Sequence, residues 1–381
     1  MDDTGKSWYN GDMSFITDMF SKVSSVLPGK STNSVVGIDI GTSSIKIAQV
    51  KLSGGKIELE TYGELSLGAY ANQEPGRATT LAPDVIAKAL GDLLRESNVT
   101  TRAAALSIQS QATLVFILEI PQVSQAELAT LIPNEARKYI PVPLTEVALD
   151  WYVVPEKVTY AEEAAADARK KMEIVVVAVR NETLSQYKQI SELAKLDVRG
   201  EEIEIFSAIR SAFHREISPT LVIDYGASTT KVSVVEYGVV RAHRVINRGS
   251  SFVTDALARS MNIKFEQAEA LKKTVGMTQV AGQETVAETI AADTQYIVNE
   301  IQTALLEYER SSHQAVTKII LAGGGSAMPG FKDKIQATFG VETVMADPFS
   351  KTEAPAFMQP VLAKAGPEFT IAVGLALKEF A

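Results

Sequence analysis

Two segments of the chain place an aspartate, a glycine, hydroxyl side chains and a lysine in the same order between apolar runs. The first, residues 35–50, reads VVGIDIGTSSIKIAQV, and the second, residues 221–236, reads LVIDYGASTTKVSVVE. Asp39 and Asp224 stand two residues before a glycine, where a carboxylate can hold Mg²⁺ directly or through water, as magnesium is usually presented to phosphates. The spacing predicts two copies of a phosphate-binding element.

The turn inside each segment consists of small residues. Backbone N–H groups of such a turn can approach an anion closely, and hydroxyl side chains can donate to phosphate oxygens. The residues expected to do so are Gly41, Thr42, Ser43 and Ser44 in the first copy and Gly226, Ala227 and Ser228 in the second. Lys46 and Lys231 follow at matching positions and can neutralise phosphate charge. Alternating β-branched residues beside each turn predict paired strands buried in a sheet.

A third candidate element is residues 319–330, IILAGGGSAMPG, where an apolar strand runs into three consecutive glycines. A turn without side chains lets the backbone lie flat against a nucleoside, so Gly324 and Gly325 are candidates to contact a base. Taken singly, an Asp-x-Gly hairpin is also an ordinary tight turn. The ordered set of three elements predicts a nucleotide site. Because no GxxxxGK[ST] loop occurs, a P-loop protein is excluded.

This ordered set resembles the actin, Hsp70 and sugar-kinase superfamily, with Ala268-Glu269-Ala270-Leu271-Lys272 lying between the second hairpin and the glycine turn. The resemblance implies an α/β fold, the actin-like ATPase fold, in which two RNase H-like lobes close over a nucleotide. It also implies that Asp39 and Asp224 approach Mg²⁺. Glu269 and Lys272 would reach the ribose, and the turn residues named above, with Lys46, would bind the phosphates.

Composition agrees with a multidomain protein. A chain of 381 residues with 46% hydrophobic content can bury sizeable cores. It has no cysteine and only three histidines, which excludes disulfides and thiolate metal sites and leaves too few imidazoles for a histidine metal centre. The net charge of −9 argues against nucleic acid as a partner. Without a run of eighteen apolar residues or a signal peptide, we expect a cytoplasmic protein.

The spacing of the motifs predicts where the domains fall. We expect an extension with an amphipathic helix at 14–27, a first lobe that contains an insertion, a second lobe, and a last helix that returns to the first lobe. The expected bounds are 1–33 for the extension, 34–102 for the lobe I core, 103–196 for the inserted subdomain, 197–218 for the return to lobe I, 219–364 for lobe II and 365–381 for the last helix. That crossing would form a hinge, so that a bound nucleotide would bias the cleft between open and closed states.

Within the insertion, the pattern predicts a strand at 104–120, a helix at 124–139, strands at 147–154 and 173–179, and a helix at 181–196, with a charged loop at 155–171. The run Asn134-Glu135-Ala136-Arg137-Lys138-Tyr139-Ile140-Pro141-Val142-Pro143, followed by Asp150-Trp151, resembles the PilM family, the cytoplasmic actin-like proteins of type IV pilus assembly. The resemblance extends from residue 35 to the end. It implies an inserted subdomain of the kind shared by PilM and the cell-division protein FtsA.

The family resemblance, and not the composition, implies partners and ligands. A PilM protein binds ATP or ADP with Mg²⁺ and captures the cytoplasmic N-terminal peptide of the membrane protein PilN. That peptide lies in a groove between the first lobe and the inserted subdomain, whose residues the sequence does not identify. The protein would be peripheral to the inner membrane through its partners, among other pilus platform proteins, and a homodimer stays open.

Hydrolysis is a separate prediction, because phosphoryl transfer needs a residue that orients water in line with the terminal phosphate. Glu135 lies in the segment where actin-like proteins place such a residue. The alternative is a surface glutamate beside Arg137 and Lys138, as helices commonly carry on their solvated face. We expect slow ATPase activity at best.

Two other functions remain as alternatives. An FtsA-like membrane tether or filament usually carries a C-terminal amphipathic anchor, which the sequence after the last helix lacks. A small-molecule kinase would need a catalytic base beside the terminal phosphate, and no Asp stands out for that role. The helix at 14–27 has Asp18 offsetting Lys22 and lacks the basic face that anionic lipids attract, so we favour packing or partner contact over membrane binding.

Overall fold

The computed structural model describes residues 33–154, 171–214 and 216–380. The predicted amphipathic helix at 14–27 and nearly all of the predicted loop at 155–171 lie outside these residues.

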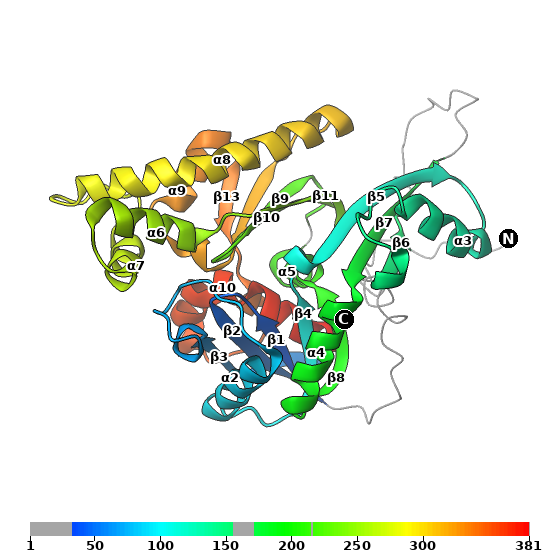
Figure 1. The fold of residues 1–381 in the computed structure, drawn as a ribbon, viewed down its shortest axis with the longest axis horizontal. Coiled ribbons are helices and arrows are strands. Elements are labelled where there is room, and N and C mark those ends of the chain that lie inside the picture. The colour runs from blue at the N-terminus through cyan, green and yellow to red at the C-terminus, as the bar shows by residue number, and fades with distance from the viewer. Residues whose placement is uncertain (1–32, 155–170, 215, 381) are drawn as a thin grey trace.

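Two five-stranded sheets with the same topology form the body (Figure 1). The first, in lobe I, has the order β3-β2-β1-β4-β8, and the second, in lobe II, has the order β11-β10-β9-β12-β13. In each sheet an antiparallel meander of three strands is extended by two parallel strands. The bounds in lobe I are β1 Ser34–Ile40, β2 Ser44–Ser53, β3 Lys56–Ser66, β4 Ala103–Ile108 and β8 Asp197–Ile203. In lobe II they are β9 Thr220–Tyr225, β10 Thr230–Glu236, β11 Val239–Ile246, β12 Lys318–Ala322 and β13 Glu342–Met345.

The two predicted hairpins are confirmed as corresponding parts of the two lobes. β1 pairs antiparallel with β2, and β9 pairs antiparallel with β10. In both hairpins the register places the aspartate directly opposite the lysine, Asp39 opposite Lys46 and Asp224 opposite Lys231. Directly opposed residues share one face of a sheet. Each hairpin therefore presents a carboxylate and an ammonium together.

Helices cover the sheets and bury their apolar faces. Lobe I carries α2 (Pro83–Glu96), α4 (Asn181–Leu193), α5 (Glu204–Ala212) and α10 (Gln359–Leu377), and lobe II carries α6 (Ser250–Met261), α7 (Phe265–Thr274), α8 (Glu284–Ser312) and α9 (Phe331–Phe339). The cores are apolar: one is built around Val36, Ile38 and Leu90, the other around Leu221, Ile297 and Phe331. The long helix α8 runs along the outside of lobe II (Figure 1).

Helix α10 lies inside lobe I and is buried on nearly all sides from Gly366 to Leu377. Two glycines allow this packing, because a Cβ at Gly37 of β1 would overlap the Ala372 carbonyl oxygen and a Cβ at Gly374 would overlap the Ser207 carbonyl oxygen of α5. By length and composition alone α10 could cross a membrane. Burial against two protein surfaces accounts for an apolar helix of this kind in a folded core.

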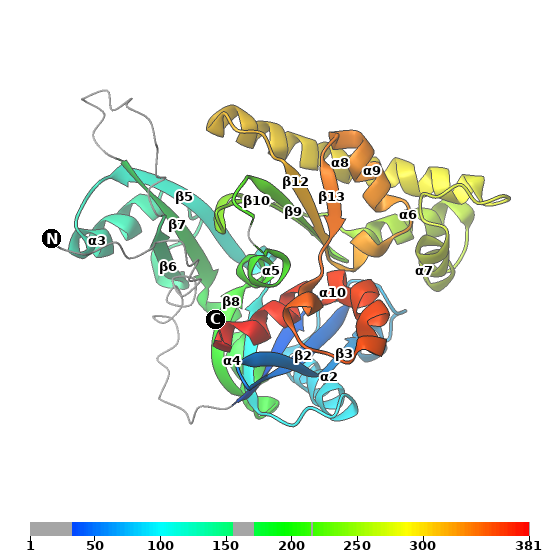
Figure 2. The same ribbon diagram turned by 180° about the vertical axis from the view of Figure 1, so that it is seen from behind.

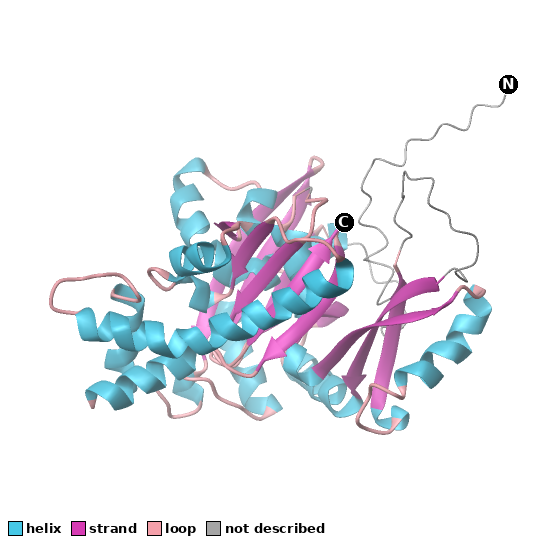
Figure 3. Cartoon of the chain, turned by 90° about the horizontal axis from the view of Figure 1, so that it is seen from above, coloured by secondary structure: helices cyan, strands magenta, loops and turns pink. Residues whose placement is uncertain are grey.

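A third, smaller sheet with the order β5-β7-β6 stands beside the lobes, with α3 on its outer side (Figure 3). Its elements are β5 (Thr113–Pro121), α3 (Gln125–Ala136), β6 (Val147–Val153) and β7 (Lys171–Arg180). The predicted insertion at 103–196 is therefore too wide, because β4 pairs with β1 and β8, and α4 packs on α2. We call residues 113–180 the inserted subdomain.

The predicted single strand at 104–120 is wrong, since the chain leaves one sheet for another at residues 109–112. Polar contacts of the main chain explain the break. The Gln109 side-chain amide donates to the Ile40 carbonyl oxygen at 2.7 Å, and the Ser110 N–H donates to the Glu204 carboxylate at 2.9 Å. These bonds direct the backbone toward the cleft between the lobes.

Candidate functional site

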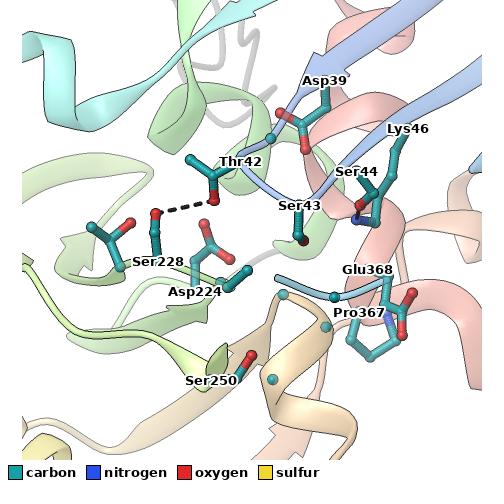
Figure 4. Close-up of a pocket in the computed structure, with 18 of the residues that line it drawn as sticks. Asp39, Thr42, Ser43, Ser44, Lys46, Asp224, Ser228, Ser250, Pro367 and Glu368 are labelled. Carbon is teal, nitrogen blue, oxygen red and sulfur yellow. Dashed lines mark hydrogen bonds between the residues drawn. The ribbon is translucent and has the colours of Figure 1, made fainter. Parts of the chain in front are cut away.

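A cavity of about 640 Å³ lies between the two lobes. Of the predicted site residues, all except Glu135 line it: Asp39, Gly41, Thr42, Ser43, Ser44, Lys46, Asp224, Gly226, Ala227, Ser228, Glu269, Lys272, Gly324 and Gly325. In Figure 4 the first hairpin lies on one side of the cavity and the second hairpin on the other. Ligand pockets for molecules of nucleotide size have volumes of about 300–1,000 Å³.

The position of the cavity follows from the sheet topology. β1, β4 and β8 run parallel in lobe I, as do β9, β12 and β13 in lobe II, and the residues just after several of these strands line the cavity. Ligands of open α/β sheets bind outside the carboxyl ends of the strands. Duplication of the topology brings two such edges together.

Asp39 is almost fully buried at the base of the first hairpin. Its Oδ1 accepts a hydrogen bond from Ser107 Oγ at 2.8 Å. Burial, with the negative charge of Glu204 nearby, raises the pKa of Asp39 to about 6, and Lys46 opposes that shift. At neutral pH the carboxylate is ionised at an energetic cost that a cation placed beside it would relieve.

In the second hairpin, Lys231 Nζ is 3.0 Å from Asp224 Oδ2 and 3.2 Å from Glu204 Oε1. Burial alone would lower the pKa of Lys231, but the two carboxylates hold it above its ordinary value. The ammonium is therefore charged and fixed in place. Lys46 is held similarly, 3.0 Å from Glu64 Oε1 and donating to Ser44 Oγ at 2.7 Å.

The tips of the two hairpins touch each other. Thr42 Oγ1 donates to Ser228 Oγ at 3.1 Å, and this bond is drawn in Figure 4. Gln111, which follows β4, donates from its side-chain amide to Ser228 Oγ at 2.8 Å and to Thr229 Oγ1 at 3.2 Å. Hydroxyl groups of both lobes thus meet across the cleft. A ligand that accepts hydrogen bonds at this point would be held by both lobes at once.

Glu269 and Lys272 lie on α7 with an ion pair of 2.7 Å. Thr254 Oγ1 donates to Glu269 Oε2 at 2.6 Å, and Lys272 Nζ donates to the Ser250 carbonyl oxygen at 3.1 Å. Burial alone would raise the pKa of Glu269, but the Lys272 ammonium holds it below its ordinary value. Burial lowers the pKa of Lys272, and the Glu269 carboxylate opposes that shift. These contacts hold both side chains in place before any ligand arrives.

The glycine turn follows β12 and packs on β9. Gly323 has φ +81°, and a Cβ there would overlap Asp224 Oδ1. A Cβ at Gly325 would lie 2.7 Å from the Tyr225 ring. Two of the three glycines are therefore required by protein packing, whereas a Cβ at Gly324 would meet only Glu368 at an ordinary 3.6 Å. The turn lines the cavity with backbone, which a flat ligand can approach.

Glu135 is not brought to the cavity, which corrects its predicted role. It lies on α3 of the inserted subdomain, where Lys138 Nζ donates to its Oε2 at 2.6 Å on the protein surface. In Figure 1, α3 lies at one end of the molecule, away from the hairpin strands β1, β2, β9 and β10. The surroundings of Glu135 are those of the alternative prediction, a surface glutamate beside basic residues.

Sequence reasoning missed several residues that line the cavity, above all Glu204, the first residue of α5. Its Oε2 accepts from the Ser110 N–H and Oγ at 2.9 and 2.7 Å, and its Oε1 faces Lys231. Glu64, Glu368 and Lys364 line the cavity as well. Glu204 and Gln111 come after β8 and β4. The sequence pattern predicted neither a strand at 197–203 nor a strand end near residue 108, so no local signal marked these two residues.

The residues present fit a nucleotide with Mg²⁺. Five lysines and six carboxylates line the cavity, a formal balance of −1, so a polyphosphate needs a cation to accompany it. Among the described residues, no three acidic or histidine side chains converge to form a complete metal site. Magnesium is characteristically bound by one or two carboxylates, with phosphate oxygens and water completing its shell. Asp39 and Asp224 would supply those carboxylates.

Comparison with solved structures identifies the fold. The chain resembles a structure described as the PilM-PilN type IV pilus biogenesis complex, with a TM-score of 0.76 and 24% identity over 91% of this chain and 98% of that one. It also resembles the ethanolamine utilization protein EutJ from Carboxydothermus hydrogenoformans, with a TM-score of 0.52 and 15% identity over 96% of both chains. The α/β architecture with two lobes is the predicted actin-like ATPase fold, which is confirmed.

Sequence comparison finds cell-division proteins among the relatives. FtsA of Enterococcus faecalis is 22% identical over 347 residues, which is 81% of this chain and 77% of that protein. FtsA of Bacillus subtilis is 23% identical over 348 residues, covering 82% of this chain and 78% of that protein. The model of the family described as type IV pilus assembly protein PilM matches residues 37–380. The chain therefore belongs to the PilM family of type IV pilus assembly proteins.

Proposed function

We propose that this chain is a nucleotide-binding scaffold of the type IV pilus inner-membrane platform, which binds ATP or ADP with Mg²⁺ and holds the cytoplasmic N-terminal peptide of PilN. The observation that carries the nucleotide part is the convergence of two Asp-Lys hairpins, the Glu269–Lys272 pair and the glycine turn on one cavity. Membership of the PilM family carries the pilus part.

In this proposal each element of the cavity has one task. The N–H and hydroxyl groups of both hairpin turns hold phosphate oxygens, while Asp39 and Asp224 hold Mg²⁺. Glu269 accepts hydrogen bonds from the ribose hydroxyl groups, and Lys272 donates hydrogen bonds to them. Gly324 lies by the base. Mg²⁺, when bound, offsets phosphate charge that the paired lysines leave uncompensated. Bridging of both lobes by one ligand favours the closed cleft.

Hydrolysis, if it occurs, should be slow. Glu204 is the buried carboxylate beside the hairpins and replaces Glu135 as the candidate to orient water. Both its oxygens are already engaged, one by Ser110 and the other by Lys231. A carboxylate held in this way has little freedom to accept a proton from water. Binding and conformational change, rather than turnover, fit this arrangement.

The proposed partner rests on the relative whose structure is described as the PilM-PilN complex. A peptide held between lobe I and the inserted subdomain would keep the protein at the inner membrane through PilN. Other platform proteins would then find a cytoplasmic docking surface. The FtsA relatives support one competing function, a membrane tether or filament.

Calorimetric titration of the purified chain tests both parts. We expect MgATP to bind with one-to-one stoichiometry, and a synthetic peptide of the first dozen residues of the PilN from the same genome to bind one-to-one as well. A scrambled peptide is the control. Binding of MgATP without binding of the peptide would overturn the pilus scaffold, and sedimentation of filaments with MgATP would then favour the tether. Failure to bind MgATP or MgADP would overturn the nucleotide site.

A further inference from the structure

The inserted subdomain is attached to one lobe by its chain but packs on both lobes. Its chain arrives from β4 and leaves into α4, which both belong to lobe I. Its sheet nevertheless lies beside β11 of lobe II, as both Figure 1 and Figure 2 show. A change in the angle between the lobes must therefore either carry the inserted sheet along or break its contacts with lobe II.

Those contacts centre on an ion cluster that spans the boundary. Arg241 of β11 donates from Nη1 to Glu173 Oε2 of β7, and its Nε is 3.3 Å from Glu236 Oε2 of β10. Arg241 and Glu236 are nearly buried, with 9% and 5% of their side chains exposed, whereas Glu173 is 44% exposed. We call these three residues the Arg241 cluster. The buried Glu236 carboxylate holds the Arg241 guanidinium within lobe II, and the more exposed Glu173 makes the directional contact across the boundary.

Apolar packing surrounds the Arg241 cluster. Val154 and Val175 of the inserted subdomain form a buried group with Val239 of β11. Tyr152 of β6 packs against a buried cluster that includes Val240 of β11. Toward lobe I, its ring meets the Phe206 ring of α5 at 6.4 Å between centroids. The inserted sheet is thus fixed to lobe II by both polar and apolar contacts. Close-packed contacts of this kind move as a unit rather than deform gradually.

The same strands reach the nucleotide cavity. β10 begins beside the second hairpin turn, where Lys231 pairs with Asp224, and it ends at Glu236 in the Arg241 cluster. Lys231 and Glu236 are five positions apart along the extended strand, a distance of about 17 Å. Between them, Ser233 Oγ and His243 Nδ1 lie 2.8 Å apart and join β10 to β11. β10 and β11 are joined by main-chain pairing and by the contact between Ser233 and His243. This hairpin therefore contacts both the nucleotide cavity and the Arg241 cluster.

We propose that the Arg241 cluster couples the inserted subdomain to lobe II, so that nucleotide binding at the hairpins repositions the inserted sheet through β10 and β11. This inference rests on the proposed nucleotide-binding function. It assigns a positioning role to Arg241 and Glu173, which touch no ligand. The pilus partner would then meet a surface whose arrangement depends on the occupancy of the cavity.

Trp151 on β6 provides a direct readout. The chain has two tryptophans, so a Trp8→Phe background leaves Trp151 as the sole indole, packed in the inserted core away from the cavity. We expect its emission to change on MgATP titration with a midpoint equal to the calorimetric dissociation constant. Glu173→Gln and Arg241→Ala should reduce the emission change by at least half while the calorimetric constant stays within about threefold.

Arg244→Ala is the matched control. Arg244 lies on the same strand but pairs with Glu307 of α8 at 2.8 Å, inside lobe II, and should keep the full emission change. Glu173→Gln guards against misfolding of the Arg241 variant, because Arg241 retains Glu236 there. The proposal is overturned if calorimetry shows MgATP binding but Trp151 does not respond, or if Glu173→Gln responds as fully as the control. Absence of MgATP binding in the background itself would refute the nucleotide site instead.

Discussion

Asp39 shows how one residue can serve ligand binding at a cost to stability. It is buried next to Glu204 and opposite Lys46, and its pKa is raised to about 6. The folded protein therefore binds the Asp39 proton more tightly than the unfolded chain does, and stability falls as the pH rises from about 4 to about 6. A shift of about two units corresponds to roughly 3 kcal/mol. An incoming Mg²⁺ would recover that energy.

Asp39→Asn should consequently separate stability from binding. At pH 7.5 we expect the free energy of unfolding to rise by about 2 to 3 kcal/mol, because the buried charge is gone, while MgATP affinity falls at least tenfold. The stability gain should disappear near pH 4, where Asp39 is protonated in the wild type. Denaturant titrations at both pH values and calorimetry measure the two effects. Glu96→Gln, at an exposed position, is the control and should change stability by less than about 0.5 kcal/mol.

At the scale of elements, the sequence predicted what local pattern encodes. Both hairpins were predictable because alternating β-branched residues, an Asp and a small-residue turn are all local signals. The break between β4 and β5 was not, because its cause is the long-range bonding of Gln109 to Ile40 and of Ser110 to Glu204. Glu204 itself has no sequence motif, and only the sheet order reveals that it faces the second hairpin.

Helix packing also depends on contacts that the sequence does not display. Gly374 of α10 touches the Ser207 carbonyl oxygen of α5, whereas Gly91 of α2 has open space where a Cβ would stand. Gly374→Ala should therefore destabilise the protein by at least about 2 kcal/mol, because the methyl group separates the two helices.

Gly91→Ala is its counterpart in a helix without that contact. It should stabilise the protein by about 0.5 to 1 kcal/mol, since alanine favours the helix. Denaturant unfolding of both variants measures the difference. Equal stability of Gly374→Ala and the wild type would contradict the close approach of α5 and α10.

At the scale of the whole molecule, the cleft is closed by contacts outside the cavity as well as within it. Arg77, in the loop between β3 and α2, reaches across to lobe II. Its Nη1 is 3.1 Å from Asp255 of α6, and its guanidinium lies 4.1 Å from the centroid of the Phe265 ring of α7. The neighbouring Gly76 lines the cavity near Glu269. This loop lies over the side of the cavity that Glu269 lines.

Arg77→Ala should therefore speed the release of bound nucleotide. The ion pair is about one-third exposed, so it and the ring contact together contribute about 1 kcal/mol, which corresponds to a roughly fivefold faster dissociation rate. Stopped-flow chase of a fluorescent ATP analogue measures the rate. Arg95→Ala, which removes a pair with Asp92 within lobe I, should leave the rate unchanged. An unchanged rate in Arg77→Ala would show that the loop does not restrain the ligand.

The position of α10 also sets the order in which the protein can fold on the ribosome. β1 spans residues 34–40, but the helix that packs on it spans residues 359–377. At about 5–20 residues per second, translation leaves β1 without that partner for roughly 15 to 65 s. Lobe II, whose strands and helices lie between these segments, can complete its core first. The lobe that is synthesised first is thus finished last, and the face of β1 on which α10 packs lacks that cover until α10 emerges.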